Sequence, residues 1–305
     1  MSYTAGQVSV WNGVGWEQVV EPFWSPSPGS VSSYGTGLLI NYPGTAHTMS
    51  SWVEIIGSAN AGKAIGFGLA ASLSAQNNAT LIEIAKGTAG GETTILAPIP
   101  VGSWILNSNI SGRNALFFPI ELAAGDRISA RIQGQRTTGS VTIYHPITVD
   151  AQNTTTATAL DVIGTDLATS KGVALSQTAD VYVEVTGSAA ATYGALIAVV
   201  SAGTGSLGNR SGAITIATGA AGSEVDLFSR SYASDTAERI WFNNSQGTTF
   251  NNLFHYASGS ATTTGPNGYI SNNIWPVFIP QGTRIAAKAS FGTASSDIAI
   301  IGVKP

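Results

Sequence analysis

The chain has 305 residues with 10% charged, 43% hydrophobic, a formal net charge of −4 and no cysteine. Charge is scarce against about 25% in typical domains, which disfavours exposed helices built from Glu, Lys and Arg, and the lack of cysteine excludes a disulfide framework or a thiolate metal site. The 13 basic residues are scattered and form no row that could neutralise phosphates, so we expect no nucleic-acid partner.

The first segment, residues 1–45, contains a hairpin signal. Asn12-Gly13 lies between two strand-like runs, and this dipeptide favours a tight turn. Because an isolated hairpin is marginal in water, we expect its aromatic residues to pack on another surface. Trp11, Trp16 and Trp24 are therefore the candidate assembly contacts of an N-terminal arm.

The same end of the chain bears on localisation. It lacks the basic and apolar regions of a signal peptide, and no apolar run approaches the ~20 residues of a membrane-spanning helix. We therefore expect a protein that is made in a cytoplasm, is not exported by a signal of its own and does not insert into a membrane.

Short segments with alternating hydrophobicity follow along the chain, bounded by Gly, Asn, Ser or Thr. Examples are 52–56, 80–84, 141–144, 181–185 and 298–301. Period-two alternation without long helical segments predicts strands in antiparallel sheets. We expect an all-β fold of sandwiches of the jelly-roll or immunoglobulin-like kind.

Three landmarks recur in the same order in the two halves of the chain. They are 52–59 and 182–189, 79–92 and 212–224, and 118–131 and 275–288. Such self-similarity predicts two tandem homologous β-sandwich domains, jelly-roll-like, after the N-terminal arm. The expected boundaries are 46–150 for the first repeat, 151–179 for a connector and 180–305 for the second repeat.

The second repeat carries an insertion. Glu224 and Trp275 are 51 positions apart, against 26 between Glu92 and Phe118, so about 25 residues are added within about 228–272. Aromatic residues alternate there with Asn and Ser, a composition suited to binding surfaces. The candidate contacts are Trp241, Phe242, Asn243, Phe250, Phe254, His255 and Tyr256. The insertion could shield its own sheet edge, contact another subunit, or bind a receptor or glycan.

Three charged positions are repeated in both halves, and we interpret them as structural. They are Glu54 and Glu184, Glu92 and Glu224, and Arg127 and Arg284. The second pair follows a glycine-rich turn that lacks the Lys-Ser/Thr and the helix of a phosphate loop. We expect these glutamates to accept backbone N–H bonds at the turn or to pair with the arginines.

Catalytic constellations are missing from the pattern. His47, His145 and His255 show no metal-ligand spacing and no nucleophile elbow. We expect no catalytic residue, no metal and no cofactor, although two of the 17 acidic residues could serve a polysaccharide hydrolase, which stays as a third alternative.

The motifs Trp-Val-Glu-Ile-Ile-Gly-Ser-Ala, Ala-Thr-Leu-Ile-Glu-Ile-Ala-x-Gly-x-Ala-Gly-x-Glu and Phe-Pro-Ile-x-Leu-Ala-Ala-Gly-Asp-Arg-Ile-Ser-Ala-Arg resemble β-domains in structural proteins of tailed bacteriophages, in tail, fibre and head-decoration components. This resemblance implies a non-enzymatic part of the virion, with no catalytic residues to transfer. The partners would be further copies of the chain, in a homo-oligomer such as a trimer, and other virion proteins. The alternative is a receptor- or carbohydrate-binding protein that uses the aromatic insertion on a host surface glycan.

Overall fold

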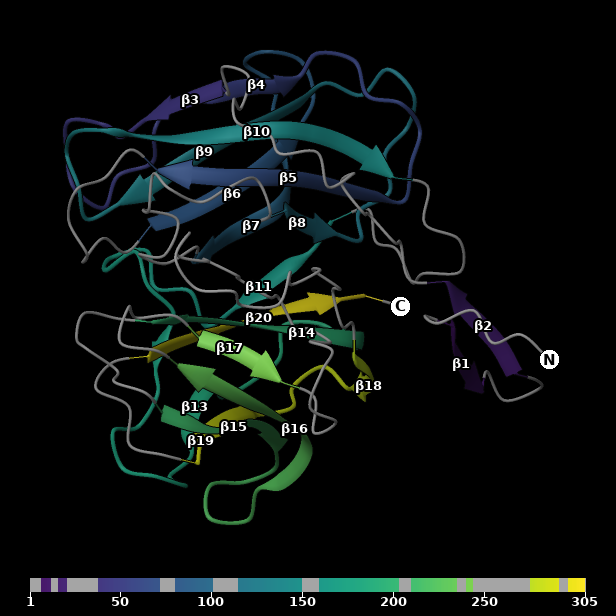
Figure 1. Ribbon diagram of the computed structural model, residues 1–305, viewed down its shortest axis with the longest axis vertical. Helices are drawn as coiled ribbons and strands as arrows, with labels where there is room; N and C mark the ends of the chain where they lie inside the picture. Colours follow the sequence, from purple (N-terminus) through teal and green to yellow (C-terminus); the bar gives the residue numbers. More distant parts are fainter. Residues whose placement is uncertain are drawn as a thin grey trace, which may run out of the picture.

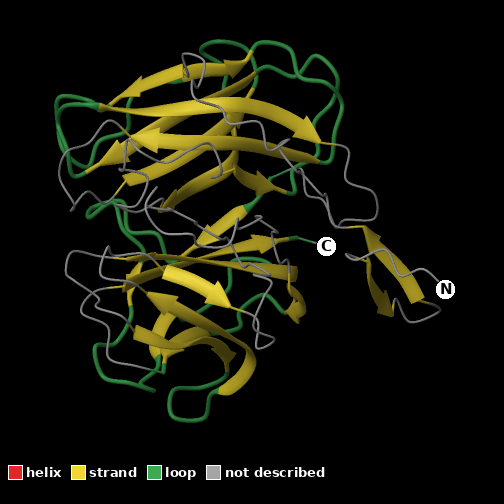
Figure 2. Ribbon diagram, in the orientation of Figure 1, coloured by secondary structure: helices red, strands yellow, loops and turns green. Residues whose placement is uncertain are grey.

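The computed structural model describes most of the chain as strands and connecting loops. The described residues are 7–11, 16–20, 38–71, 80–100, 115–149, 159–202, 210–234, 240–243, 275–290 and 296–304. Every regular element among them is a strand, as Figure 2 shows. The all-β expectation is confirmed for these ranges, in which no helix long and apolar enough to cross a bilayer occurs.

The N-terminal hairpin is present. Strands β1 (Gln7–Trp11) and β2 (Trp16–Val20) pair antiparallel, with Trp11 directly opposite Trp16. Figure 1 places this hairpin to one side of the two larger bodies. Trp24 lies outside the described residues.

The first sandwich consists of two four-stranded antiparallel sheets. One has the order β3 (Leu38–Asn41), β10 (Ser140–Val149), β5 (Ala64–Ala71), β8 (Ala115–Phe118), and the other β4 (Val53–Ile56), β9 (Ile128–Gly134), β6 (Thr80–Lys86), β7 (Thr93–Pro100). Their facing sides enclose one buried cluster that includes Ile40 and Phe67 from the first sheet and Ile84 and Ile132 from the second. Alternation along the strands supplies these inward residues.

The second sandwich has the same two-layered build. One sheet has the order β11 (Asp161–Ile163), β20 (Ser296–Val303), β14 (Tyr193–Ala202), β18 (Trp275–Ile279), with β12 (Val173–Ala174) also on β20. The other has the order β13 (Val183–Thr186), β19 (Ile285–Ala289), β15 (Arg210–Thr218), β16 (Val225–Ser234), β17 (Ile240–Asn243). Tyr193, Leu196, Ile216 and Ile285 lie in the core between them.

Strand β20 explains how the two sandwiches join. Its run from Ile298 to Val303 is apolar on both faces, the pattern of a strand covered on both sides. Ile298 and Ile300 lie in the second core, whereas Ile301 and Val303 lie in the first core cluster. The two sandwiches therefore share buried surface through one strand.

A loop between β11 and β12 adds polar contacts to this joint. Ser170, fully buried with a φ of 58°, has its Oγ 2.9 Å from His47 Nδ1, and Gln133 Nε2 donates to the same Oγ at 3.1 Å. Thr165 Oγ1 donates to the Pro98 carbonyl at 2.8 Å. The loop is therefore anchored to three separate segments of the first sandwich.

Three short strands lie in segments that were predicted to be an arm and a connector. Residues 38–41, assigned to the arm, form β3 in the first sandwich, and residues 161–174, within the assigned connector, contain β11 and β12 on β20. These strands are two to four residues long, too short for an alternating pattern to be recognised. Their hydrogen-bonding partners, which are far away in sequence, decide their assignment.

The buried carboxyl of Asp297 on β20 is expected to make the stability of the protein depend on pH. It is 7% exposed, and burial raises the pKa of its carboxyl above the usual value, partly offset by Lys171. Since the folded pKa lies above the unfolded one, stability falls as the pH rises from about 4 through that folded pKa. Asp297→Asn is expected to raise the free energy of unfolding at neutral pH and to lose this gain near pH 3. Urea unfolding at both pH values measures it, and a gain independent of pH would contradict the assignment.

Candidate functional site

Arg127, the residue before β9, ties three segments of the first sandwich together. Its Nε donates to Glu54 Oε2 at 2.6 Å, and its Nη1 donates to Glu92 Oε1 at 3.1 Å. Nη1 also donates to the Gly87 carbonyl at 3.1 Å. Since Glu54 lies on β4 and the other two flank the β6–β7 turn, one guanidinium joins the edge strand, the turn and the start of β9.

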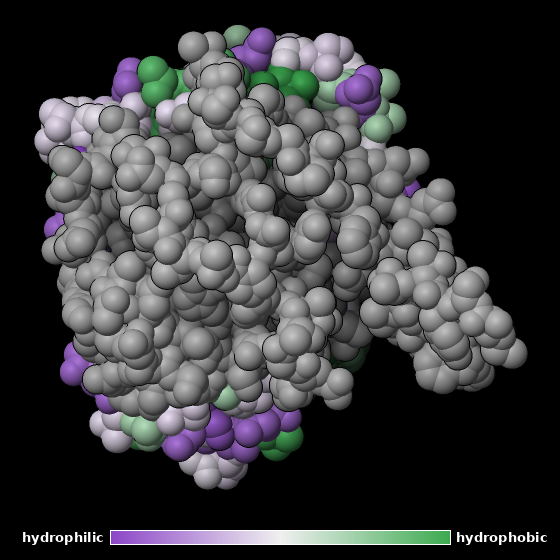
Figure 3. Space-filling model, in the orientation of Figure 1, coloured by the Kyte–Doolittle hydropathy of each residue, from purple (hydrophilic) through white to green (hydrophobic). Residues whose placement is uncertain are grey.

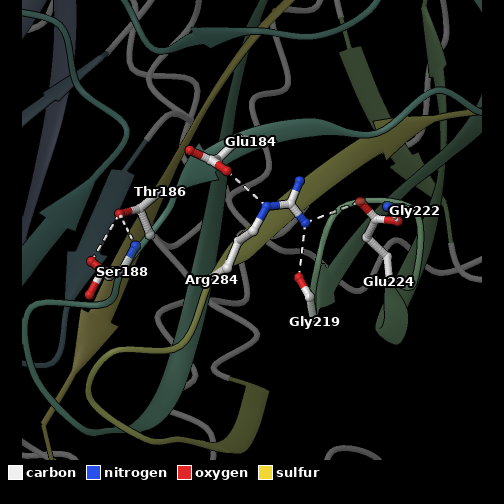
Figure 4. A network of polar contacts seen from close by, with 7 residues as sticks. All are labelled: Glu184, Thr186, Ser188, Gly219, Gly222, Glu224 and Arg284. Atoms are coloured by element: carbon white, nitrogen blue, oxygen red, sulfur yellow. Dashed lines mark hydrogen bonds and ion pairs between the residues drawn. The ribbon is translucent and has the colours of Figure 1, made fainter.

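Arg284 makes the same set of contacts in the second sandwich. Its Nε donates to Glu184 Oε2 at 2.8 Å, and its Nη1 donates to Glu224 Oε1 at 3.1 Å and to the Gly219 carbonyl at 2.9 Å. Figure 4 shows the guanidinium between Glu184 on one side and Glu224 with Gly219 on the other. The ion pairs expected from the repeated residues are present in both sandwiches.

The second glutamate of each cluster also builds the glycine-rich turn. Gly90 N donates to Glu92 Oε2 at 2.9 Å, and the matching bond in the β15–β16 turn is 3.0 Å. Gly87 has a φ of 127°, and a Cβ there would lie 2.6 Å from the Gly91 carbonyl oxygen. Glycine is required at this position, and the segment is a strand connection, as expected, and not a phosphate loop.

Hydrogen bonds keep these carboxylates ionised. The Glu92 backbone N–H, followed by Arg127 and the Gly90 N–H, holds the pKa of the Glu92 carboxyl below its usual range, and the same set of groups lowers the pKa of Glu224. The hydrogen bond to Glu54 raises the pKa of Arg127. A carboxylate with a lowered pKa is a weak base and the arginine stays protonated, so the cluster is suited to hold structure and not to transfer protons.

A second cluster in the first sandwich centres on Arg131. Its guanidinium carbon lies 4.3 Å from the centroid of the Trp52 ring, a cation–π distance. Arg131 Nε donates to Glu83 Oε2 at 2.6 Å, and Thr94 Oγ1 donates to Glu83 Oε1 at 2.6 Å. The Glu83 side chain is 5% exposed, and these two partners compensate its burial.

The second sandwich has a comparable cluster around Lys288. Its Nζ lies 4.4 Å from the centroid of the Tyr182 ring and 3.4 Å from Asp226 Oδ2. The Tyr182 hydroxyl donates to Asp226 Oδ1. The same three kinds of group, an aromatic ring, a cation and a carboxylate, are thus joined in both sandwiches.

The carboxylate of the cluster lies on non-equivalent strands in the two sandwiches. Backbone pairing places Ala85 opposite Thr94 in the first sandwich and Ala217 opposite Asp226 in the second. By this register Asp226 on β16 matches Thr94 on β7, and Thr215 matches Glu83, since each lies opposite the cation of its own cluster. A carboxylate on either strand reaches the cation, so the ion pair is kept while its position differs.

This relocation predicts a rescue. Glu83→Thr leaves Arg131 without its carboxylate and is expected to lower the free energy of unfolding by about 1–2 kcal/mol. The loss is expected to be small because the Arg131 side chain is partly exposed to solvent. Adding Thr94→Asp, which copies the second sandwich, is expected to recover most of the loss. Urea unfolding of both single variants and of the double variant measures the coupling. A double variant no more stable than Glu83→Thr would contradict the equivalence.

The aromatic residues of the insertion fall partly within the described chain. Trp241, Phe242 and Asn243 belong to β17, which pairs with β16 and extends that sheet by one strand. The described part of the insertion therefore covers a sheet edge, one of the three roles considered. Phe250, Phe254, His255 and Tyr256 lie outside the described residues, and a receptor or glycan role for the insertion stays a prediction.

The histidines are dispersed. His47 contacts Ser170 at the joint, the backbone of His145 lies in β10, and His255 falls outside the described residues. Within the described ranges, no three residues of the His, Cys, Asp and Glu types gather as a metal site would require.

The polar residues that join the two sandwiches could not be predicted from the sequence. Gln133, Thr165 and Ser170 are ordinary polar residues in the pattern, and their partners lie in the other sandwich. One signal was available, because Gly164 and Gly172 bracket the loop. A Cβ at Gly164 would lie 2.7 Å from Val185 Cγ1, and one at Gly172 would lie 2.6 Å from the Ile298 carbonyl oxygen, so both glycines mark close packing.

No protein-family model matches the chain, and no curated protein matches it. A function is therefore inferred from the contacts that the chain itself makes.

Proposed function

We propose that the chain is a non-enzymatic structural protein of a tailed-phage virion, belonging to the head decoration or to the tail, neck or fibre. It is built from two homologous jelly-roll-like domains and acts through assembly into a homo-oligomer and with other virion proteins. The phage context comes from the motif resemblance, and the structural role is supported by the contacts described above.

Strand order supports the duplicated domain. The orders β3-β10-β5-β8 and β11-β20-β14-β18 match position by position, as do β4-β9-β6-β7 and β13-β19-β15-β16. Eight strands in two four-stranded antiparallel sheets are the composition of a jelly roll. The pairing irregularity also recurs, between Glu54 and Ile56 in one sandwich and between Glu184 and Thr186 in the other.

The observation that carries the structural role is the use of the repeated charges. Arg127 and Arg284 each engage two glutamates and a turn carbonyl in the same geometry. Charged residues that recur in both domains and whose side chains bond to one another have a structural role. The joint through β20 makes the two sandwiches a fixed unit, which suits a building block that must present surfaces in constant relation.

The assembly function is tested in the full chain. We expect sedimentation velocity at micromolar concentration to give a homo-oligomer. Replacing both Trp11 and Trp16 by serine is expected to lower its mass while urea unfolding of the sandwiches stays unchanged, because the hairpin pairs apart from both cores (Figure 1). A parent chain that sediments as a monomer would overturn the proposal.

Mass spectrometry of purified phage particles that carry the gene tests the virion assignment.

A further inference from the structure

We propose that the hairpin β1–β2 of one copy adds as strands to the β3 edge of a second copy of the chain. This deepens the assembly function proposed above and rests on it, because it names the surface on which the arm docks. Strand addition to a sheet edge combines main-chain hydrogen bonds with side-chain contacts on both faces of the sheet.

The β3 edge exposes apolar side chains on both of its faces. Leu39 is 57% exposed and Leu38 is 39% exposed, and adjacent residues of a strand point to opposite faces. Hydrophobic residues are visible at the surface of the end that carries β3 and β4 (Figure 3). An edge strand with exposed leucines on both faces is a template for pairing with another strand.

The matching edge of the second sandwich is already docked. Strand β11 occupies the position of β3 in its sheet, and the residue before it, Leu160, bonds to β7 of the first sandwich, with its N–H 2.8 Å from the Ile95 carbonyl. The loop after β11 reaches His47 and Gln133. The β11 edge therefore makes contacts within the chain. The equivalent β3 edge pairs with β10 on one side, and no described strand pairs with its other side.

The hairpin is complementary to that edge. Among the described strands, β1 and β2 pair with each other and with no third strand, and two strands alone are marginal in water. Their register puts Val8 opposite Val19 on one face and Trp11 opposite Trp16 on the other. A hairpin added to β3 would thus present apolar residues on both faces of the extended sheet, as β3 does with Leu38 and Leu39.

The hairpin of a second copy is the expected occupant. Figure 1 places the hairpin to one side of the molecule, away from its own β3. Residues 21–37 join β2 to β3, a length that spans at most about 55–60 Å when extended, enough to reach a neighbouring copy. Exchange of arms between copies follows, with each copy giving one hairpin and receiving one.

Disulfide trapping tests this contact, because the chain has no cysteine of its own. Leu39→Cys is mixed with Val8→Cys, and separately with Val19→Cys, since either strand of the hairpin could lie next to β3. After subunit exchange and mild oxidation, we expect a mixed disulfide dimer in at least one mixture on non-reducing gels. Phe278→Cys, at a 72% exposed position on the edge strand β18, replaces Leu39→Cys as the matched control and is expected to give none.

Each other outcome overturns the proposal in a recognisable way. Dimers of Leu39→Cys alone would indicate β3 pairing with β3. An intramolecular disulfide in the Val8→Cys/Leu39→Cys chain, without mixed dimers, would indicate docking on the chain's own edge. An oligomer that the tryptophan replacements dissociate, but that yields no mixed disulfide, would refute the β3 target and leave the assembly function standing. A monomeric parent chain would refute both.

Discussion

Replacing Gly172 by alanine is expected to lower the free energy of unfolding by about 3 kcal/mol. A Cβ at this position would lie 2.6 Å from the carbonyl oxygen and 2.7 Å from the carbonyl carbon of Ile298. Those are backbone atoms of β20, which pairs with three strands, so they cannot move aside as a flexible side chain could. Calorimetry should show a melting temperature lower by about 5 °C.

Gly44→Ala is the matched control. No heavy atom lies within 4 Å of a Cβ built at Gly44, and its φ does not fall in the left-handed region. Its melting temperature is expected to stay at or slightly above that of the parent, because alanine restricts the unfolded chain. Equal melting temperatures for the two variants would show that the close approach of Gly172 to β20 does not stabilise the protein.

Replacing Ile301 by alanine is expected to cost about 2–5 kcal/mol and to uncouple the two sandwiches. Ile301 belongs to a strand of the second sandwich but is fully buried in the first core cluster. Because this side chain links the two cores, the parent chain is expected to unfold in one calorimetric transition. The variant is expected to unfold in two, with the first sandwich melting separately.

Ile298→Ala on the same strand is the comparison for this effect. Ile298 is equally buried but lies in the core of its own sandwich. A loss of similar size is expected without a split transition. If Ile301→Ala also unfolds in one transition, or costs less than about 1 kcal/mol, the shared strand does not couple the sandwiches.

Much of the ionic cluster could be predicted from the repeat. Arg127 and Arg284 stood out because each has matching glutamates in its own half, and the structure joins each arginine to both of them. The Asn12-Gly13 turn likewise predicted the hairpin that β1 and β2 form. Local turn chemistry and repetition within one chain are visible in a sequence without knowledge of distant partners.

The Arg131 cluster could not be predicted from the repeat. Its carboxylate is Glu83 on β6, whereas the Lys288 cluster uses Asp226 on β16, so the two halves do not match residue by residue. Recognising the exchange requires the register, which places Thr94 and Asp226 at the same level of their sheets. Register depends on pairing across long sequence separations, and composition does not report it.

The sequence by itself determined the strand content, the repeated landmarks and the residues of the Arg127 and Arg284 clusters, because alternation, turn glycines and duplicated charges are local properties of the chain. The tertiary structure alone decided that residues 38–41 and 161–174 contribute strands to the sandwiches and that β20 supplies both cores. A strand of two to four residues has no periodicity of its own, and an apolar run does not state which core each face meets. Those assignments follow from hydrogen-bond partners and packing that exist only once distant segments meet.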